Sequence, residues 1–187
     1  MTVQLHMRRE LNGLPELAVP EGCELRTLTP GDHEMWTSLL HGNGELGEWD
    51  LERARPLFAP GSPMPLGGAF LASVGGRPAA TAQLHLHSDG GAYAPMPELG
   101  WVAALPEYRG HRLGRLVCLA VLRHAAGLGH ERIFLKTDDH RLPAIRTYLR
   151  LGFQPWMYDA TAPERWAVLL RNWPDLDQIT GAAGDAG

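Results

Sequence analysis

The sequence has few cysteines and no long apolar run. Of its 187 residues only Cys23 and Cys118 are cysteines, which is too few for a disulfide framework and typical of a protein in a reducing compartment. No apolar stretch of about 18 residues occurs, so no membrane-spanning helix is expected. The start, MTVQLHMRRE, lacks the charged-then-apolar layout of a secretory signal. These absences predict a cytoplasmic protein that does not bind a membrane.

The sequence also contains fewer basic than acidic residues. Lys and Arg number 17 against 21 Asp and Glu, which gives a formal net charge of −4. A domain that follows a nucleic-acid backbone carries the opposite sign, so nucleic acid is not expected as a partner. The hydrophobic content of 44% is enough for one compact domain with its own core.

Proline and glycine suggest where that domain begins and ends. Residues 1–21 are expected to be an irregular N-terminal extension, because Pro15 and Pro20 break any long helix. Residues 22–173 hold the periodic patterns of a single domain. Residues 174–187 are rich in glycine and alanine and predict a flexible tail.

Inside the domain, strand and helix patterns alternate. Strands are expected over 23–28, 68–74, 78–87, 98–105 and 132–136, with Gly75-Gly76 closing a hairpin. Helices are expected over 29–40, 51–58, 112–128 and 143–151, the first with Thr29 as N-cap and Pro30 at its first position. Segments 153–159 and 166–170 close the pattern as a last hairpin. The order predicts an α/β fold with a mixed, mostly antiparallel sheet of about six to seven strands flanked by helices.

The segment PEYRGHRLGR (106–115) joins a strand to the long helix. Backbone N–H groups at a helix start have no partner inside the helix, and with the helix dipole they attract an anion. Gly110 and Gly114 would let a phosphate approach the backbone. Positive charge gathers in the same place, from Arg109, His111, Arg112 and Arg115. The segment therefore predicts a phosphate site, with a basic surface turn as the alternative.

Neither a P-loop GxxxxGK[ST] nor a dinucleotide GxGxxG motif fits this segment. It resembles the pyrophosphate loop Q/R-x-x-G-x-G/A of GNAT acetyltransferases, with Arg109, Leu113 and Gly114 in register and Arg112 in place of the middle glycine. A second segment, RLPAIRTYLRLGF (141–153), resembles that family's N-x-x-A-I-x-x-Y-x-x-x-G-F pattern, with Arg141 in place of the asparagine. The positions that match are Ala144, Ile145, Tyr148, Gly152 and Phe153. The resemblance covers roughly residues 22–173.

The resemblance implies acetyl-CoA as co-substrate, held in a V-shaped opening of the sheet. It implies that the pantetheine arm pairs with the backbone of Val102, Ala103 and Ala104, and that Arg141 lies near that arm. It further implies phosphate contacts from the loop residues Arg109, Gly110, His111, Arg112, Leu113, Gly114 and Arg115. The expected reaction moves an acetyl group to a primary amine.

Acyl transfer to an amine needs a base and an acid. The resemblance implies that Tyr148 donates a proton to the departing sulfur, with a core tyrosine as the alternative. Glu98 is the candidate base, because strand alternation places it on one face with Gly100, Val102 and Ala104. A solvated charge at the strand start is the alternative for Glu98.

His85 and His87 share a strand face and are candidates for the base or for substrate contact. No third ligand is spaced to complete a metal site with them, so no metal is expected. Asp138 and Asp139 follow a strand, and one of them is expected to cap the next helix.

The acceptor is expected to be a small-molecule amine. Acidic groups mixed with aromatic rings suit a cation, and the candidate contacts are Glu45, Glu48, Trp49, Asp50, Trp156 and Tyr158. A mobile acidic loop is the alternative for residues 45–50. A peptide or protein acceptor, and a CoA-binding module without catalysis, remain open as alternative functions. The oligomeric state is open between a monomer and a homodimer.

Overall fold

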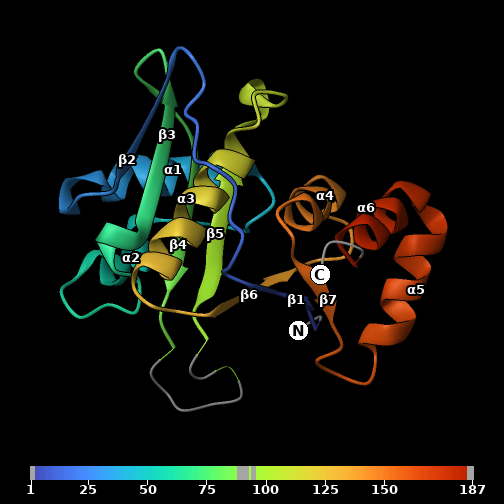
Figure 1. Cartoon of the computed structure of the whole chain (residues 1–187). Helices are drawn as coiled ribbons and strands as arrows, with labels where there is room; N and C mark the ends of the chain where they lie inside the picture. The colour runs from blue at the N-terminus through green and yellow to red at the C-terminus, as the bar shows by residue number, and fades with distance from the viewer. Residues whose placement is uncertain (1–2, 88–92, 94–95, 185–187) are drawn as a thin grey trace. The chain divides into compact units, whose positions relative to one another are not determined.

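The computed structural model describes residues 3–87, 93 and 96–184 (Figure 1). The chain divides into two compact units. The larger unit is Leu11–Ile133, and the smaller unit combines Met1–Glu10 with Phe134–Gly187. Each unit contributes strands of its own.

The larger unit contains four strands in the order β2-β3-β4-β5, and all neighbours are antiparallel. Their bounds are β2 Cys23–Thr27, β3 Ala69–Val74, β4 Arg77–His85 and β5 Glu98–Ala104. The hairpin between β3 and β4 turns at Gly75 and Gly76, which have φ angles of 54° and 75°. Only glycine adopts two such consecutive angles at little cost, so the predicted hairpin is confirmed together with its cause.

Strand β5 contains one extra residue relative to its neighbour. Gly100 lies opposite Gln83, and Ala103 lies opposite Thr81, so three steps along β5 match two along β4. Trp101 within this stretch has φ 48°, an unusual backbone conformation for a residue with a side chain. This is a β-bulge, a feature that often re-aims side chains beside functional sites.

The bulge corrects the strict alternation expected for this strand. Residues that face each other across an antiparallel ladder point to the same side of the sheet. Glu98, Gly100 and Ala103 therefore share one face, and Val102 and Ala104 lie on the other. Because of the extra residue, the alternation of side chains between the two faces is shifted by one position after Gly100.

Two helices flank this sheet. Helix α1 (His33–Asn43) follows the short helix η1 (Pro30–Asp32) and contacts β4 and β5, while α3 (Leu113–Gly127) contacts β3, β4 and β5 (Figure 1). The face with Glu98 lies on the α1 side, because Ala103 belongs to a buried cluster with Trp36 of α1. The predicted cap is confirmed, with Thr29 before η1 and Pro30 at its start.

The remaining helices of this unit are short. They are α2 (Leu51–Ala54), η2 (Arg55–Phe58), η3 (Leu66–Gly68) and η4 (Pro106–Tyr108). Segments α2 and η2 match the helix expected over 51–58, and Phe58 packs edge-on against Trp36 at 5.4 Å. The aromatic packing fixes this helical segment on the same side of the sheet as α1.

The smaller unit contains β6 (Arg132–Thr137), which begins at the unit boundary, then β1 (Leu5–Glu10) and β7 (Gln154–Trp156), in the order β6-β1-β7. Its helices are α4 (Leu142–Arg150), α5 (Ala162–Asn172) and α6 (Pro174–Gly184). The guanidinium of Arg146 donates to both carboxylate oxygens of Asp175, at 2.5 and 3.1 Å. This pair ties α4 to α6.

Two expectations about the chain ends are wrong. Residues 1–21 are not all irregular, because β1 pairs antiparallel with β7. Residues 166–170 form no hairpin strand, since Trp166 and Leu169 are buried on one side of helix α5. The tail is helical as far as Gly184, its flexibility stays a prediction, and residues 185–187 lie outside the described part.

The predicted fold class is confirmed as an α/β fold with mostly antiparallel strands and flanking helices. Seven strands occur among the described residues. The V-shaped opening stays a prediction. Along the described chain, no helix combines the length and apolar character needed to cross a bilayer.

Candidate active site

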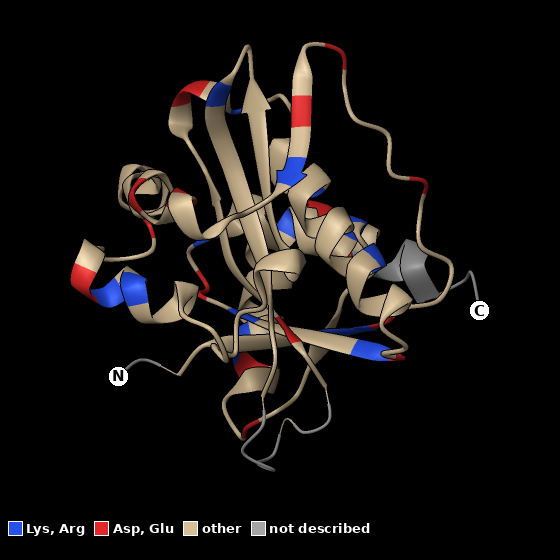
Figure 2. Ribbon diagram, turned by 90° about the vertical axis from the view of Figure 1, so that its left-hand side faces the viewer, with Lys and Arg blue, Asp and Glu red and all other residues tan. Residues whose placement is uncertain are grey.

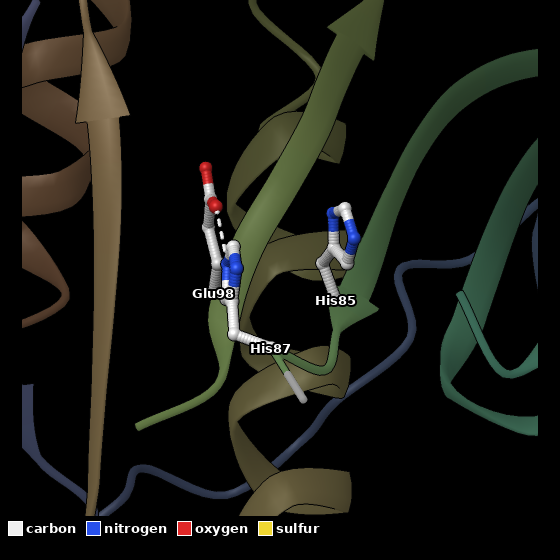
Figure 3. Close-up of side chains that lie close together, drawn as sticks. All are labelled: His85, His87 and Glu98. Atoms are coloured by element: carbon white, nitrogen blue, oxygen red, sulfur yellow. Dashed lines mark hydrogen bonds and ion pairs between the residues drawn. The ribbon is translucent and has the colours of Figure 1, made fainter. Parts of the chain in front are cut away.

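A carboxylate and an imidazole meet at the edge where β4 ends and β5 begins. Nε2 of His87 and Oε2 of Glu98 lie 2.8 Å apart, a hydrogen bond drawn in Figure 3. Both side chains are mostly buried, with 15% and 11% of their surfaces exposed. A hydrogen bond to a buried carboxylate is stronger than the same bond in water. The two residues therefore form one polar unit.

His85 completes a group of three around this pair. It lies directly opposite Glu98 in the β4–β5 ladder, and its ring stacks on that of His87 at 4.9 Å and 16°. One donor atom from each of the three residues lies within 4.8 Å of the others. The ring of Tyr93 lies 5.7 Å from that of His87. The structure thus supplies the third metal-type ligand that sequence spacing did not.

Charge is rare in the strands that carry this group. Strands β3 and β5 hold only one charged residue, Glu98, and β4 adds only Arg77. Figure 2 likewise shows most Lys, Arg, Asp and Glu outside the central strands. Burying a carboxylate in such a setting costs free energy unless hydrogen bonds compensate. A carboxylate retained there is a candidate for chemistry.

Next to Glu98 the same face offers room. A Cβ placed on Gly100 would meet no atom within 4 Å. Gln83, opposite Gly100, is fully buried and donates from Nε2 to the Thr81 hydroxyl at 3.3 Å. Its Oε1 has no hydrogen-bond partner among the described residues. A reactant beside Glu98 would find free space at Gly100.

The loop after β5 contains the residues that are predicted to bind an anion. Helix η4 ends at Tyr108, and Gly110 and Arg112 then adopt φ angles of 89° and 57° before α3 begins at Leu113. Arg112 is the N-cap of α3 and makes no side-chain hydrogen bond to it. The first N–H groups of α3 have no partner inside the helix and no capping side chain. They are available to an anion.

The side chains around that helix start divide by role. Leu113 is 2% exposed and anchors the helix in the core, so only its backbone faces the loop. Gly114 carries no side chain, and a Cβ there would meet no atom within 4 Å. Arg109, His111 and Arg112 are exposed, and Arg115 is half-buried. Positive charge and helix dipole thus coincide.

The candidate acid lies in the smaller unit. Tyr148 in α4 is 3% exposed, and its ring packs edge-on against Phe153 at 6.0 Å. The chain turns between them at Gly152, with φ 83°, and the backbone N–H of Phe153 donates to the Tyr148 carbonyl at 3.0 Å. The turn explains the glycine-phenylalanine pair of the motif. The role of Tyr148 as acid stays a prediction.

The start of α4 corrects one expectation. Its N-cap is Arg141, which is 7% exposed and makes no capping side-chain bond. Asp138 accepts from the amide of Gln4 at 3.3 Å, and Asp139 is paired with Arg165. Neither aspartate caps the helix, because both side chains are engaged elsewhere in the smaller unit.

Trp49 is a core residue. It is 6% exposed, its indole lies 5.1 Å from those of Trp36 and Trp101, and its N–H donates to the Leu46 carbonyl at 3.2 Å. The guanidinium of Arg53 covers its ring at 4.0 Å. One face of this ring already carries a cation, and a contact of Trp49 with the acceptor amine stays a prediction.

The acidic residues around Trp49 have separate roles. Asp50 is the N-cap of α2 and accepts from the backbone N–H of Arg53 at 2.8 Å. Glu48 is almost fully exposed and lies 3.8 Å from the ring of His41. Trp156 and Tyr158 pack in the smaller unit, where the ring of Tyr158 stacks on His6 at 4.2 Å. Acceptor contacts by these residues stay predictions.

The chain is similar to known proteins over most of its length. The model of a family described as "Acetyltransferase (GNAT) family" matches residues 33–153. A mycothiol acetyltransferase of Thermobispora bispora is 36% identical over 165 residues, which cover 82% of this chain and 54% of the relative. Another, from Thermomonospora curvata, is 35% identical, with 84% and 53% covered. The chain spans about half the length of these curated relatives.

Solved structures agree in fold. A GCN5-related N-acetyltransferase from Kribbella flavida superposes with a TM-score of 0.58 at 23% identity, covering 82% of this chain and 55% of the other. At that identity the likeness concerns the fold alone. The matched residues 33–153 include Glu98, the loop at 109–115 and Tyr148.

Proposed function

The chain belongs to the GNAT acetyltransferase family, and from that membership we propose that it transfers the acetyl group of acetyl-CoA to a primary amine of a small molecule. The observation that carries this proposal is the course of β5. The strand begins at the buried Glu98, which is bonded to His87, and leads into the loop that opens the uncapped start of α3. One strand thus links a candidate base to a candidate phosphate site.

Acetyl-CoA lies along β5 in this proposal. Its phosphates are held by the first N–H groups of α3, with charge from Arg109 and Arg112. Its pantetheine arm is an extended chain with amide groups, which suit backbone partners on a strand. The family resemblance adds Arg141 as a further proposed contact.

The base has a defined task. An alkylamine with a pKa near 10.4 is unprotonated in only about one molecule in 10³ at pH 7. Glu98, oriented by His87, removes the extra proton, directly or through water. The amine nitrogen then attacks the thioester carbonyl carbon, and the space beside Gly100 receives it. A positioned base of this kind contributes about 10²–10⁴-fold in rate.

The acid completes the reaction. The tetrahedral intermediate collapses, the C–S bond breaks, and the electron pair leaves with the sulfur of CoA. Tyr148 gives its hydroxyl proton to that sulfur and regains one from solvent. The attacking nitrogen, which still carries one proton more than the amide product, loses that proton to solvent. A phenol with an ordinary pKa near 10 is protonated at neutral pH, as this role requires.

The curated relatives are named for acetylating mycothiol. We take the unacetylated precursor of mycothiol as the first acceptor to test. Simple amino sugars, amino acids and polyamines form the comparison panel. A peptide acceptor has no specific observation in its favour.

The test is release of free thiol from acetyl-CoA in the presence of each amine, with the acetylated product identified by mass. The expected result is amine-dependent thiol release with one acetylated product. Acetyl-CoA binding without turnover on any amine would replace this proposal with a CoA-binding module. No binding at millimolar acetyl-CoA would refute both.

A further inference from the structure

We propose that His85, His87 and Glu98 form a binding site for one divalent transition-metal ion of the Zn²⁺ type, and that the ion inhibits the enzyme. The binding half of this inference stands on the geometry of the three side chains. The inhibitory half rests on the proposed function, because it requires Glu98 to be the base.

The donor set is the first argument. Two imidazoles and one carboxylate are a common zinc set when a fourth position stays open. The three donor atoms lie within 4.8 Å of one another (Figure 3). In a tetrahedral zinc site, ligand atoms lie about 3.4 Å apart, given metal–ligand distances of about 2.0–2.2 Å. Side-chain rotations therefore have to close a gap of at most about 1.4 Å between donor atoms.

The backbone holds the donors in place. His85 is the last residue of β4, and Glu98 is the first of β5, directly opposite it in the ladder. His87 lies two residues beyond His85 and already contacts the Glu98 carboxylate at 2.8 Å. An ion inserted there would replace this hydrogen bond with two metal bonds, so the backbone need not move.

The surroundings supply the remaining requirements. The side chains of His87 and Glu98 are only 15% and 11% exposed, so bulk water would compete only weakly with these ligands for the ion. The next position on this face is Gly100, where no atom lies within 4 Å of a would-be Cβ. That space admits water as fourth ligand. The imidazoles favour Zn²⁺ or Co²⁺ over Mg²⁺ and Ca²⁺, which prefer oxygen ligands.

Binding would have a direct consequence for catalysis. A carboxylate that coordinates the ion through Oε2 cannot accept the amine proton at that oxygen. The hydrogen bond from His87 is lost at the same time. The bound ion therefore removes the base while leaving the phosphate loop at 109–115 unchanged, so acetyl-CoA still binds.

The experiment titrates Co²⁺ into the purified, tag-free and chelator-treated full chain and follows its visible absorption, with Zn²⁺ competition. A Cys23→Ser background removes the partly exposed thiol as a rival ligand. The variants are His85→Ala, His87→Ala and Glu98→Gln, and the matched control is His140→Ala, an exposed histidine elsewhere. Thermal melts check that each variant folds.

We expect one equivalent of Co²⁺ with an intense, tetrahedral-type spectrum that Zn²⁺ abolishes. Each ligand variant should bind at least about 10-fold more weakly, while the control should match the parent. Equal binding by the parent and all three ligand variants would refute the site. Absence of any bound equivalent would refute it as well.

The inhibitory half is measured as acetyl transfer with and without Zn²⁺, relative to the metal-free rate of each protein. The parent and the His140→Ala control should lose activity in proportion to the fraction of sites that Zn²⁺ occupies. His85→Ala should need at least about 10-fold more Zn²⁺ for the same loss of activity. Full activity at full occupancy would refute the inhibition and leave the site intact. If no amine is acetylated at all, the proposed function fails, and the Co²⁺ titration still decides the site.

Discussion

Nε2 of His87 and Oε2 of Glu98 lie 2.8 Å apart and join the end of one antiparallel strand to the beginning of the next. The contact fixes the orientation of a carboxylate that is 9% exposed as a whole residue. It also places an imidazole where a proton could pass on toward solvent. With Glu98 as the proposed base, we expect the rate to depend on both residues.

Glu98→Gln should keep acetyl-CoA affinity and lower kcat/KM by about 10²–10⁴-fold at pH 7. The loss should shrink toward high pH, because about one amine in ten is already neutral at pH 9.5 for a pKa near 10.4. The measurement is kcat/KM from pH 6 to 9.5 for both proteins. A loss that is uniform with pH would indicate a structural role, and no loss would assign the base to His85, His87 or water.

Tyr148→Phe should lower kcat by about 10–10³-fold with little change in KM for acetyl-CoA. Phenylalanine keeps the edge-on contact with Phe153 at the same site, so the melting temperature should change little. Phe153→Leu is the matched control for packing, and we expect it to affect stability more than kcat. An unchanged kcat in Tyr148→Phe would reduce the tyrosine to a packing residue.

Local signals explain which parts of the fold were predictable. Gly75-Gly76 specified a hairpin because the turn itself demands positive φ angles. The strand at Leu5–Glu10 was missed because its partner, Gln154–Trp156, lies at the far end of the chain. The bulge at Trp101 was missed because it exists only relative to the register of a neighbouring strand.

The same distinction applies to the site. The loop at 109–115 was predictable, because glycines and arginines before a helix have a local physical meaning. The contact between Glu98 and His87 was not predictable. It depends on the register of β4 on β5, which places His85 opposite Glu98, and the sequence of the long connection does not determine that register. The contact of Arg53 with the ring of Trp49 was not predictable either, because the composition of a loop does not reveal which side chains pack together.

Asp32→Asn tests the start of α1. Asp32 accepts two bonds from Arg26, at 2.7 and 2.8 Å, and two from Thr29, at 2.7 and 2.8 Å. The Arg26 hydrogen bond is the main cause that holds the pKa of Asp32 well below its usual range, despite partial burial. Since the folded-state pKa is lowered, the stabilisation is present above the unfolded pKa of about 3.9 and is lost as pH falls below it.

We therefore expect Asp32→Asn to cost about 0.2–1 kcal/mol at pH 7, because it removes the charge that pairs with the half-exposed Arg26. The difference from the parent should shrink steadily below about pH 4. The measurement is urea unfolding of both proteins at pH 7 and at several acidic values. If the difference in unfolding free energy between the two proteins does not change with pH, the carboxylate charge contributes nothing to stability.

The last prediction concerns Arg112, whose left-handed backbone and exposed side chain have separable effects. A side chain at φ 57° costs about 1–2 kcal/mol, which glycine avoids. Arg112→Gly should therefore be more stable than Arg112→Ala by about 1 kcal/mol. Both remove the guanidinium, so both should bind acetyl-CoA more weakly than the parent, and the loss should be greater at low salt. Calorimetric titrations at two salt concentrations and thermal melts without ligand separate the two effects. Tighter binding in either variant would show that the arginine obstructs the loop, and equal stability of the two would show that the backbone relaxes.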